Sequence, residues 1–99
     1  MTGTIGKARV TLYFEDTFSI KEKRGEVKRV TSRIRNRFNV AVAEIDDLND
    51  MRVATLGMTV LSTSTPHADQ MLETIIAAIE DLLDISVLGD IETEMIPFG

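Results

Sequence analysis

Apolar and polar residues alternate with a period of two in four segments of the chain, a pattern typical of strands buried on one face. The alternation predicts strands over residues 7–14, 40–45, 52–62 and 90–96. The sequence "DDLND" separates the second strand from the third and reads as a turn, and "EDTF" follows the first as a connection.

Two other segments carry apolar residues three, four and seven positions apart, which is a helical period. The first begins at Ser19, which forms an S-x-x-E capping box with Glu22, and Asn39 is its expected stop. Its apolar face holds Ile20, Val27, Val30, Ile34 and Phe38. The second helix follows "TSTP", with Thr65 as the expected N-cap and Pro66 in the first turn. Its apolar stripe holds Ala68, Met71, Leu72, Ile75, Ile79, Leu82 and Leu83.

The predicted order is strand, helix, strand, strand, helix, strand, which is the βαββαβ order of the ferredoxin-like α+β fold. Right-handed crossovers place both helices on one face of a four-stranded antiparallel sheet. The first and third strands would lie at its centre. With 99 residues, the chain is expected to form a single domain over residues 1–99.

Composition removes several classes of function. The chain has no cysteine, which excludes disulfides and thiolate chemistry. No segment has the length and apolarity of a membrane span, and we expect a cytoplasmic protein that does not contact membranes. We find no catalytic motif, and so expect no enzyme activity, no cofactor and no metal.

Positive charge is concentrated on the first predicted helix, although the formal net charge of the chain is −5. Residues 19–39 hold eight of the eleven basic residues: Lys21, Lys23, Arg24, Lys28, Arg29, Arg33, Arg35 and Arg37. On a helical wheel Lys21, Arg24, Lys28 and Arg35 fall within an arc of about 60°, and Arg29, Arg33 and Arg37 form a second row. Like charges this close repel, which indicates that they face negative charge.

Two explanations of the basic helix remain open from the residues alone. The cations can contact nucleic-acid phosphates, which gives salt-dependent affinity. Alternatively, they can pair with an acidic protein partner or with the second helix, which is acidic along one side: Asp69, Glu73, Glu80 and Asp84.

The sheet face without helices offers two further interpretations. It is rich in small or apolar groups, namely Ala41, Ala43, Thr55, Gly57 and Thr59, which would suit a homodimer. Glu92 and Glu94 on this face would repel phosphate and are expected to pair with Lys7 and Arg9, so RNA is expected on the helical side. The acidic turn at Asp46, Asp47 and Asp50, with Glu44 beside it, leaves a metal-dependent hydrolase as a further alternative.

Three stretches resemble the small bacterial family of unknown function DUF503, also described as YlxP-like. "SIKEKR" (19–24) is similar to its S-L-K-x-K-R pattern, "RIRNRFNVAVAEID" (33–46) to R-x-R-x-x-F-N-V-x-V-A-E-x-D, and Leu56–Gly57 to a strand containing LG. Where the family often has a tryptophan before the third strand, this chain has Met51. The resemblance implies a ferredoxin-like fold and marks Glu44 for testing as a site residue.

No activity is established for the family that the resemblance indicates. Its genes neighbour those of translation initiation and ribosome maturation factors in several bacteria, which implies work on RNA or the ribosome. We therefore expect an RNA- or ribosome-associated accessory protein that binds through its basic helix.

Overall fold

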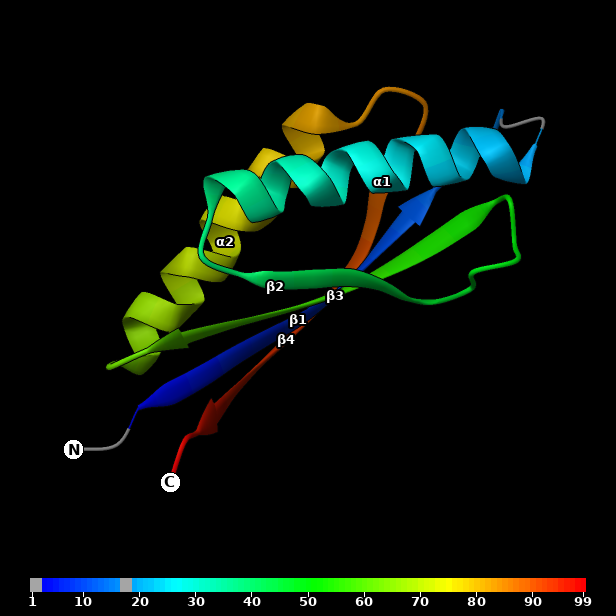
Figure 1. Cartoon of the computed structure of the whole chain (residues 1–99). Helices are drawn as coiled ribbons and strands as arrows, with labels where there is room; N and C mark the ends of the chain where they lie inside the picture. Colours follow the sequence, from blue (N-terminus) through cyan, green and yellow to red (C-terminus); the bar gives the residue numbers. More distant parts are fainter. Residues whose placement is uncertain (1–2, 17–18) are drawn as a thin grey trace.

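The computed structural model describes residues 3–16 and 19–99, so the end of the expected "EDTF" connection lies outside the described residues. Along the chain run β1 (Thr4–Tyr13), α1 (Ile20–Arg37), β2 (Ala41–Asp46), β3 (Val53–Ser62), α2 (Thr65–Leu82) and β4 (Val87–Pro97). The strands form one antiparallel sheet in the order β2-β3-β1-β4, and both helices lie on one side of it (Figure 1). The ferredoxin-like α+β fold and the two central strands are thus confirmed.

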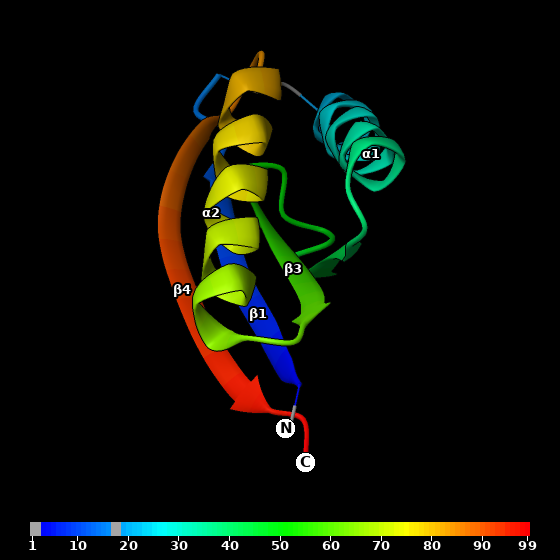
Figure 2. The ribbon, with the colours of Figure 1, turned by 90° about the vertical axis from the view of Figure 1, so that its left-hand side faces the viewer.

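The helices divide the covered face between them. Figure 2 shows α2 running along β1 and β4, whereas α1 lies to one side near β2. Between the helices and the sheet lies one core, to which both central strands contribute every second residue. Its fully buried aliphatic side chains each stabilise the fold by about 1.5–3 kcal/mol relative to an exposed position.

Close packing of α2 on β1 depends on Gly6. A Cβ atom at this position would lie 3.1 Å from Cγ2 of Val60 and 3.2 Å from Cδ1 of Leu72. The absence of a side chain therefore lets the helix approach the strand.

Helix boundaries differ from the expectation in two places. Ser64, and not Thr65, caps α2: the Ser64 hydroxyl accepts a hydrogen bond from the backbone N–H of His67, while Thr65 is already helical. In α1 the helix ends at Arg37 with Phe38 as C-cap, one residue before the expected Asn39. Both corrections are shifts of one residue, as is common at helix ends, and for α2 serine is the better N-cap of the two hydroxyl residues.

Candidate nucleic-acid interface on the first helix

Helix α1 begins where the sequence predicted. Ser19 has an extended backbone, and its hydroxyl accepts a hydrogen bond from the backbone N–H of Glu22 at 3.2 Å. Val27, Val30 and Ile34 are buried against the sheet and α2. This anchoring fixes which charged residues of the helix face outward.

Three cations at the start of α1 form a group that we call the basic cluster: Lys21, Arg24 and Lys28. All three are exposed, and none makes an ion pair or a side-chain hydrogen bond within the described part of the chain. They are three and four residues apart, so they follow one side of the helix over two turns, about 10 Å. The cluster therefore presents three unneutralised positive charges to solvent.

The remaining outward cations of α1 are partly engaged. The guanidinium of Arg35 donates to the backbone carbonyl of Val42 at 3.0 Å and so covers part of the free edge of β2. Arg29 pairs with Glu26 at 3.1 Å, and the guanidinium of Arg37 lies 5.0 Å from the ring centre of Phe38. Arg33 is exposed and has no such contact with the described residues, but it lies on the other flank of the helix, away from the basic cluster.

Lys23 does not belong to the exposed surface, which corrects its expected role as a phosphate ligand. Its side chain is 0% exposed and its ammonium points into the protein. The ammonium donates to the carbonyls of Asp47 at 2.5 Å and Asp50 at 2.6 Å, and it lies 2.9 Å from Oε2 of Glu44. The two carbonyl acceptors and the opposite charge of Glu44 together compensate this buried ammonium.

The acidic turn is wrapped around that lysine. Asp47 has a left-handed backbone (φ 61°), and its carbonyl accepts from the backbone N–H of Asp50 at 3.0 Å, which closes the turn. Outside the turn, the Asp47 carboxylate accepts from the Thr55 hydroxyl at 2.8 Å. This bond leaves Thr55 2% exposed, so Thr55 is not part of the accessible open face.

The other carboxylates of the turn are also occupied. Oδ1 of Asp46 accepts from the backbone N–H of Asp47, and its Oδ2 lies 3.0 Å from the Arg9 guanidinium; the two contacts lower the pKa of Asp46. Asp50 accepts from the backbone N–H of Arg52. Within the described residues no three acidic or histidine side chains are placed to hold a metal ion.

Glu26 is a second charged residue of α1 that the fold buries, with 5% of its surface exposed. Its carboxylate accepts from the backbone N–H groups of Asp84, Ile85 and Ser86 at 2.9–3.0 Å, and from the Ser86 hydroxyl. Burial by itself would raise the pKa of Glu26, but these four hydrogen bonds outweigh it and lower the pKa. Glu26 thereby ties α1 to the connection between α2 and β4.

One signal in the sequence could have revealed that Lys23 faces inward. On the apolar face of α1, Ile20 and Val27 are seven positions apart, with six residues between them. A helix that keeps one face inward must place residue 23 in that gap, because it lies three and four positions from the two apolar residues. The inward position is therefore readable, although its partners are not.

No ion pair joins the basic residues of α1 to acidic side chains of α2 in the part of the chain that the structure describes. The hollow between the end of α1 and the start of α2 is about 310 Å³ in volume and has no acidic residue in its lining: Phe38, Asn39, His67, Gln70, Met71, Thr74 and Ile75. The alternative in which the cations of α1 pair with acidic residues of α2 is therefore not realised among the described residues.

The expected pairs on the sheet are half confirmed. Lys7 pairs with Glu94 at 3.3 Å, as predicted. Arg9 instead pairs with Asp46 at 3.0 Å, although Glu92 is its neighbour in the ladder. A bulge in β2 between Glu44 and Asp46 is the reason, because the extra residue brings Asp46 onto the open face with Arg9.

A family model described as "Protein of unknown function (DUF503)" matches residues 5–91. The chain belongs to the DUF503 family. It is 31% identical over 81 residues to the "Uncharacterized protein YlxP" of Bacillus subtilis (strain 168), which covers 82% of this chain and 88% of that protein. The match to this family of unknown function includes α1, the acidic turn and both central strands.

A solved structure shares the fold of this DUF503 protein at low identity. The "De novo designed protein Foldit4" is similar with a TM-score of 0.53 and 16% identity, over 95% of this chain and 96% of that chain. At this identity the likeness concerns the fold alone. None of the described helices has the length and apolar character needed to span a membrane.

Proposed function

We propose that this protein binds RNA through the basic cluster of α1. The observation that carries the proposal is the contrast on one helix: the inward charges Lys23 and Glu26 are compensated by polar contacts, whereas the basic cluster has no partner among the described residues. Like charges three and four residues apart destabilise an isolated helix by a few tenths of a kcal/mol per pair. An external polyanion would remove that repulsion.

The surroundings of the basic cluster favour nucleic acid over a protein partner. Apart from Gly25, every exposed residue of α1 is polar or charged. A protein interface of ordinary strength requires apolar or aromatic anchors at its centre. Phosphate contacts need only flexible cations, and Lys21, Arg24 and Lys28 supply these without an apolar neighbour.

The size of the salt effect follows from the number of contacts. Three phosphates neutralised by the basic cluster give a slope of log K against log salt of about −2 for a single strand and about −2.7 for a duplex. Between about 50 and 200 mM salt the affinity should therefore fall roughly 20- to 40-fold. The remaining surface, with its net negative charge, should repel RNA and confine binding to this face.

The test uses fluorescence anisotropy with a labelled fragment of structured ribosomal RNA at these two salt concentrations. The variant Lys21→Gln/Arg24→Gln/Lys28→Gln keeps good helix formers and removes the basic cluster. We expect it to lose most of the binding and to keep the free energy of unfolding within about 0.5 kcal/mol.

The matched control is Lys7→Gln/Arg9→Gln/Arg52→Gln, which removes three positive charges from other exposed positions. We expect this control to retain most of the affinity and the salt slope. Absence of wild-type binding at the lower salt would refute the proposal. An equal loss in both variants would show a general charge effect and would refute the assignment to α1.

A further inference from the structure

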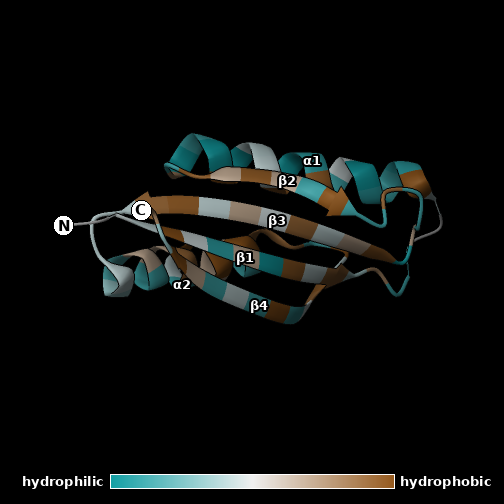
Figure 3. Ribbon diagram, turned by 90° about the horizontal axis from the view of Figure 1, so that it is seen from below, coloured by the Kyte–Doolittle hydropathy of each residue, from teal (hydrophilic) through white to brown (hydrophobic). Residues whose placement is uncertain are grey.

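The face of the sheet that carries no helix has a regular arrangement of side chains across its four strands. In one row Ala41 of β2 pairs with Thr59 of β3, Thr59 with Lys7 of β1, and Lys7 with Glu94 of β4. The next row in the same direction holds, in the same strand order, Ala43, Gly57, Arg9 and Glu92. Figure 3 shows this open face with its strands in the order β2, β3, β1 and β4.

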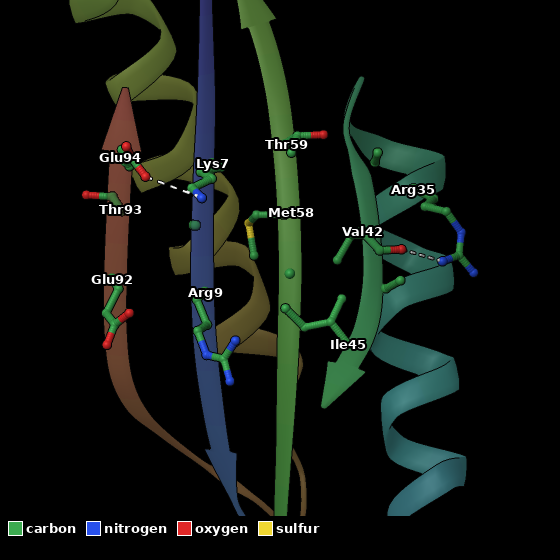
Figure 4. A pocket seen from close by; sticks show the side chains of 14 residues that line it. Lys7, Arg9, Arg35, Val42, Ile45, Met58, Thr59, Glu92, Thr93 and Glu94 are labelled. Atoms are coloured by element: carbon green, nitrogen blue, oxygen red, sulfur yellow. Dashed lines mark hydrogen bonds and ion pairs between the residues drawn. The ribbon is translucent and has the colours of Figure 1, made fainter. Parts of the chain in front are cut away.

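The two halves of the open face differ in height. Long side chains stand on β1 and β4, whereas β2 and β3 carry alanine, glycine and threonine, as Figure 4 shows around Lys7, Arg9, Glu92, Glu94 and Thr59. We call the first half the ridge (Lys7, Arg9, Glu92 and Glu94) and the second the trough (Ala41, Ala43, Gly57 and Thr59). Both line one groove of about 820 Å³.

The trough is bordered by exposed apolar side chains. Ile45 lies over Gly57, where an added Cβ would come within 2.7 Å of its Cδ1, and yet Ile45 is 50% exposed. At the other end of β3, Leu61 is 60% exposed. Apolar groups of this size next to a groove are typical of a surface that another molecule covers.

The charges of the ridge balance one another. Lys7 and Arg9 stand beside Glu94 and Glu92 in the ladder, and Lys7 is already paired with Glu94. A balanced surface can be covered by a partner without leaving an uncompensated net charge. The two carboxylates also make it a poor surface for phosphate, so nucleic acid is not its occupant.

We propose that the occupant is a second copy of this chain, related by a two-fold axis that runs parallel to the strands between β1 and β3. Such an axis places the ridge of each copy in the trough of the other, because β1 then faces β3 and β4 faces β2. In each row Ala41 faces Glu94 of the second copy, and Ala43 faces Glu92. An isologous contact requires a surface that complements itself in this way.

The area is sufficient for a stable dimer. Three strands of ten or eleven residues and β2 with six, about 4.8 Å apart and rising about 3.3 Å per residue, give a face of about 600 Å². Burying one such face on each copy removes roughly 1,200 Å² from solvent, which exceeds the roughly 1,000 Å² expected of a specific interface. In this dimer the two basic clusters lie on opposite outer sides, so each remains accessible.

The test measures molecular mass by sedimentation equilibrium at protein concentrations up to about 0.1 mM. We expect the wild type to dimerise, with little dependence on salt, since the two positive and two negative charges of the ridge sum to zero. The variants Ala41→Glu and Ala41→Lys add a side chain of similar size at an exposed position on an edge strand. Circular dichroism confirms that each variant is folded.

Comparing a negative with a positive side chain at position 41 tests the proposed orientation of the two copies. Glutamate at position 41 would face Glu94 of the second copy, so Ala41→Glu should weaken dimerisation at least about tenfold more than Ala41→Lys. A monomeric wild type at every concentration would overturn the proposal. Equal weakening of dimerisation by the two variants, or no weakening by either, would overturn the proposed orientation of the two copies. RNA binding by the basic cluster is measured separately, so failure of one proposal is distinguishable from failure of the other.

Discussion

The inward and outward charges of helix α1 have different environments, although they alternate along the same 18 residues. Lys23 and Glu26 are buried and compensated by several polar contacts, and each fixes a loop: Lys23 the acidic turn, Glu26 the connection after α2. Lys21, Arg24 and Lys28 are exposed and unpartnered among the described residues. The comparison teaches that a basic segment can serve folding on one face and remain available for binding on the other.

The largest effect should come from removing the buried ammonium. Lys23→Met keeps the length of the side chain but removes the positive charge beside the Glu44 carboxylate and the donor to the carbonyls of Asp47 and Asp50, of which only Asp47 retains another donor. Removing one partner of a buried ion pair lowers the free energy of unfolding by about 3–5 kcal/mol. Urea denaturation should show this loss.

The matched control is Lys28→Met on the exposed face of the same helix, which we expect to change the free energy of unfolding by less than about 0.5 kcal/mol. A loss of similar size in both variants would mean that burial of the charge is not the cause. Retention of full stability by Lys23→Met would contradict the account of the turn.

A smaller loss is expected for Glu26→Gln. The amide nitrogen cannot accept from the backbone donors of residues 84–86, and one or two unsatisfied donors cost about 1–3 kcal/mol each. The exposed Glu80→Gln on α2 is the control and should be nearly neutral. Thermal unfolding followed by circular dichroism compares the two.

Glu26 also predicts a pH dependence. Its pKa in the folded protein lies below the ordinary value of 4.5, so its contribution to stability is complete above that value and is lost as the pH falls through the folded pKa. Between about pH 5 and 3 the free energy of unfolding should fall more steeply in the wild type than in Glu26→Gln. If the free energies of unfolding of the two proteins change in parallel with pH, the fold does not hold the Glu26 carboxylate in its charged form.

The smallest effect is a gain of stability on the outer face. Gly25 has no atom within 4 Å of an added Cβ, so Gly25→Ala should stabilise the helix by about 0.5–1 kcal/mol. Gly6→Ala is the contrasting variant and should destabilise, since its Cβ would press on Val60 and Leu72. If Gly25→Ala proves destabilising, the outer face of α1 is more tightly packed than its exposure indicates.

Local sequence patterns were enough to predict the helices and strands, but not to predict the contacts of the charged residues. Alternation identified β1 and β3, and the capping box located the start of α1 at Ser19. The partner predicted for Arg9 was wrong because a bulge in β2 changes which face of the sheet Asp46 occupies. A period-two pattern of apolar residues does not reveal such a bulge.

The candidate site was predicted in the same uneven way. The sequence identified α1 as the basic element and located its cations, but it grouped Lys23 with the surface. The alternative in which these cations pair with α2 is not realised among the described residues, because no ion pair joins the two helices there. Charge composition contains no information about the direction in which a neighbouring helix is turned.

By itself the sequence determined the βαββαβ order, the apolar faces and the concentration of positive charge on one helix, because these depend on the spacing of residues along the chain. The tertiary structure decided which of those charges are available. Burial of Lys23 requires two carbonyl acceptors from a turn that is 24 to 27 residues away, and burial of Glu26 requires donors 58 to 60 residues away. Contacts across such separations exist only once the sheet has brought the segments together.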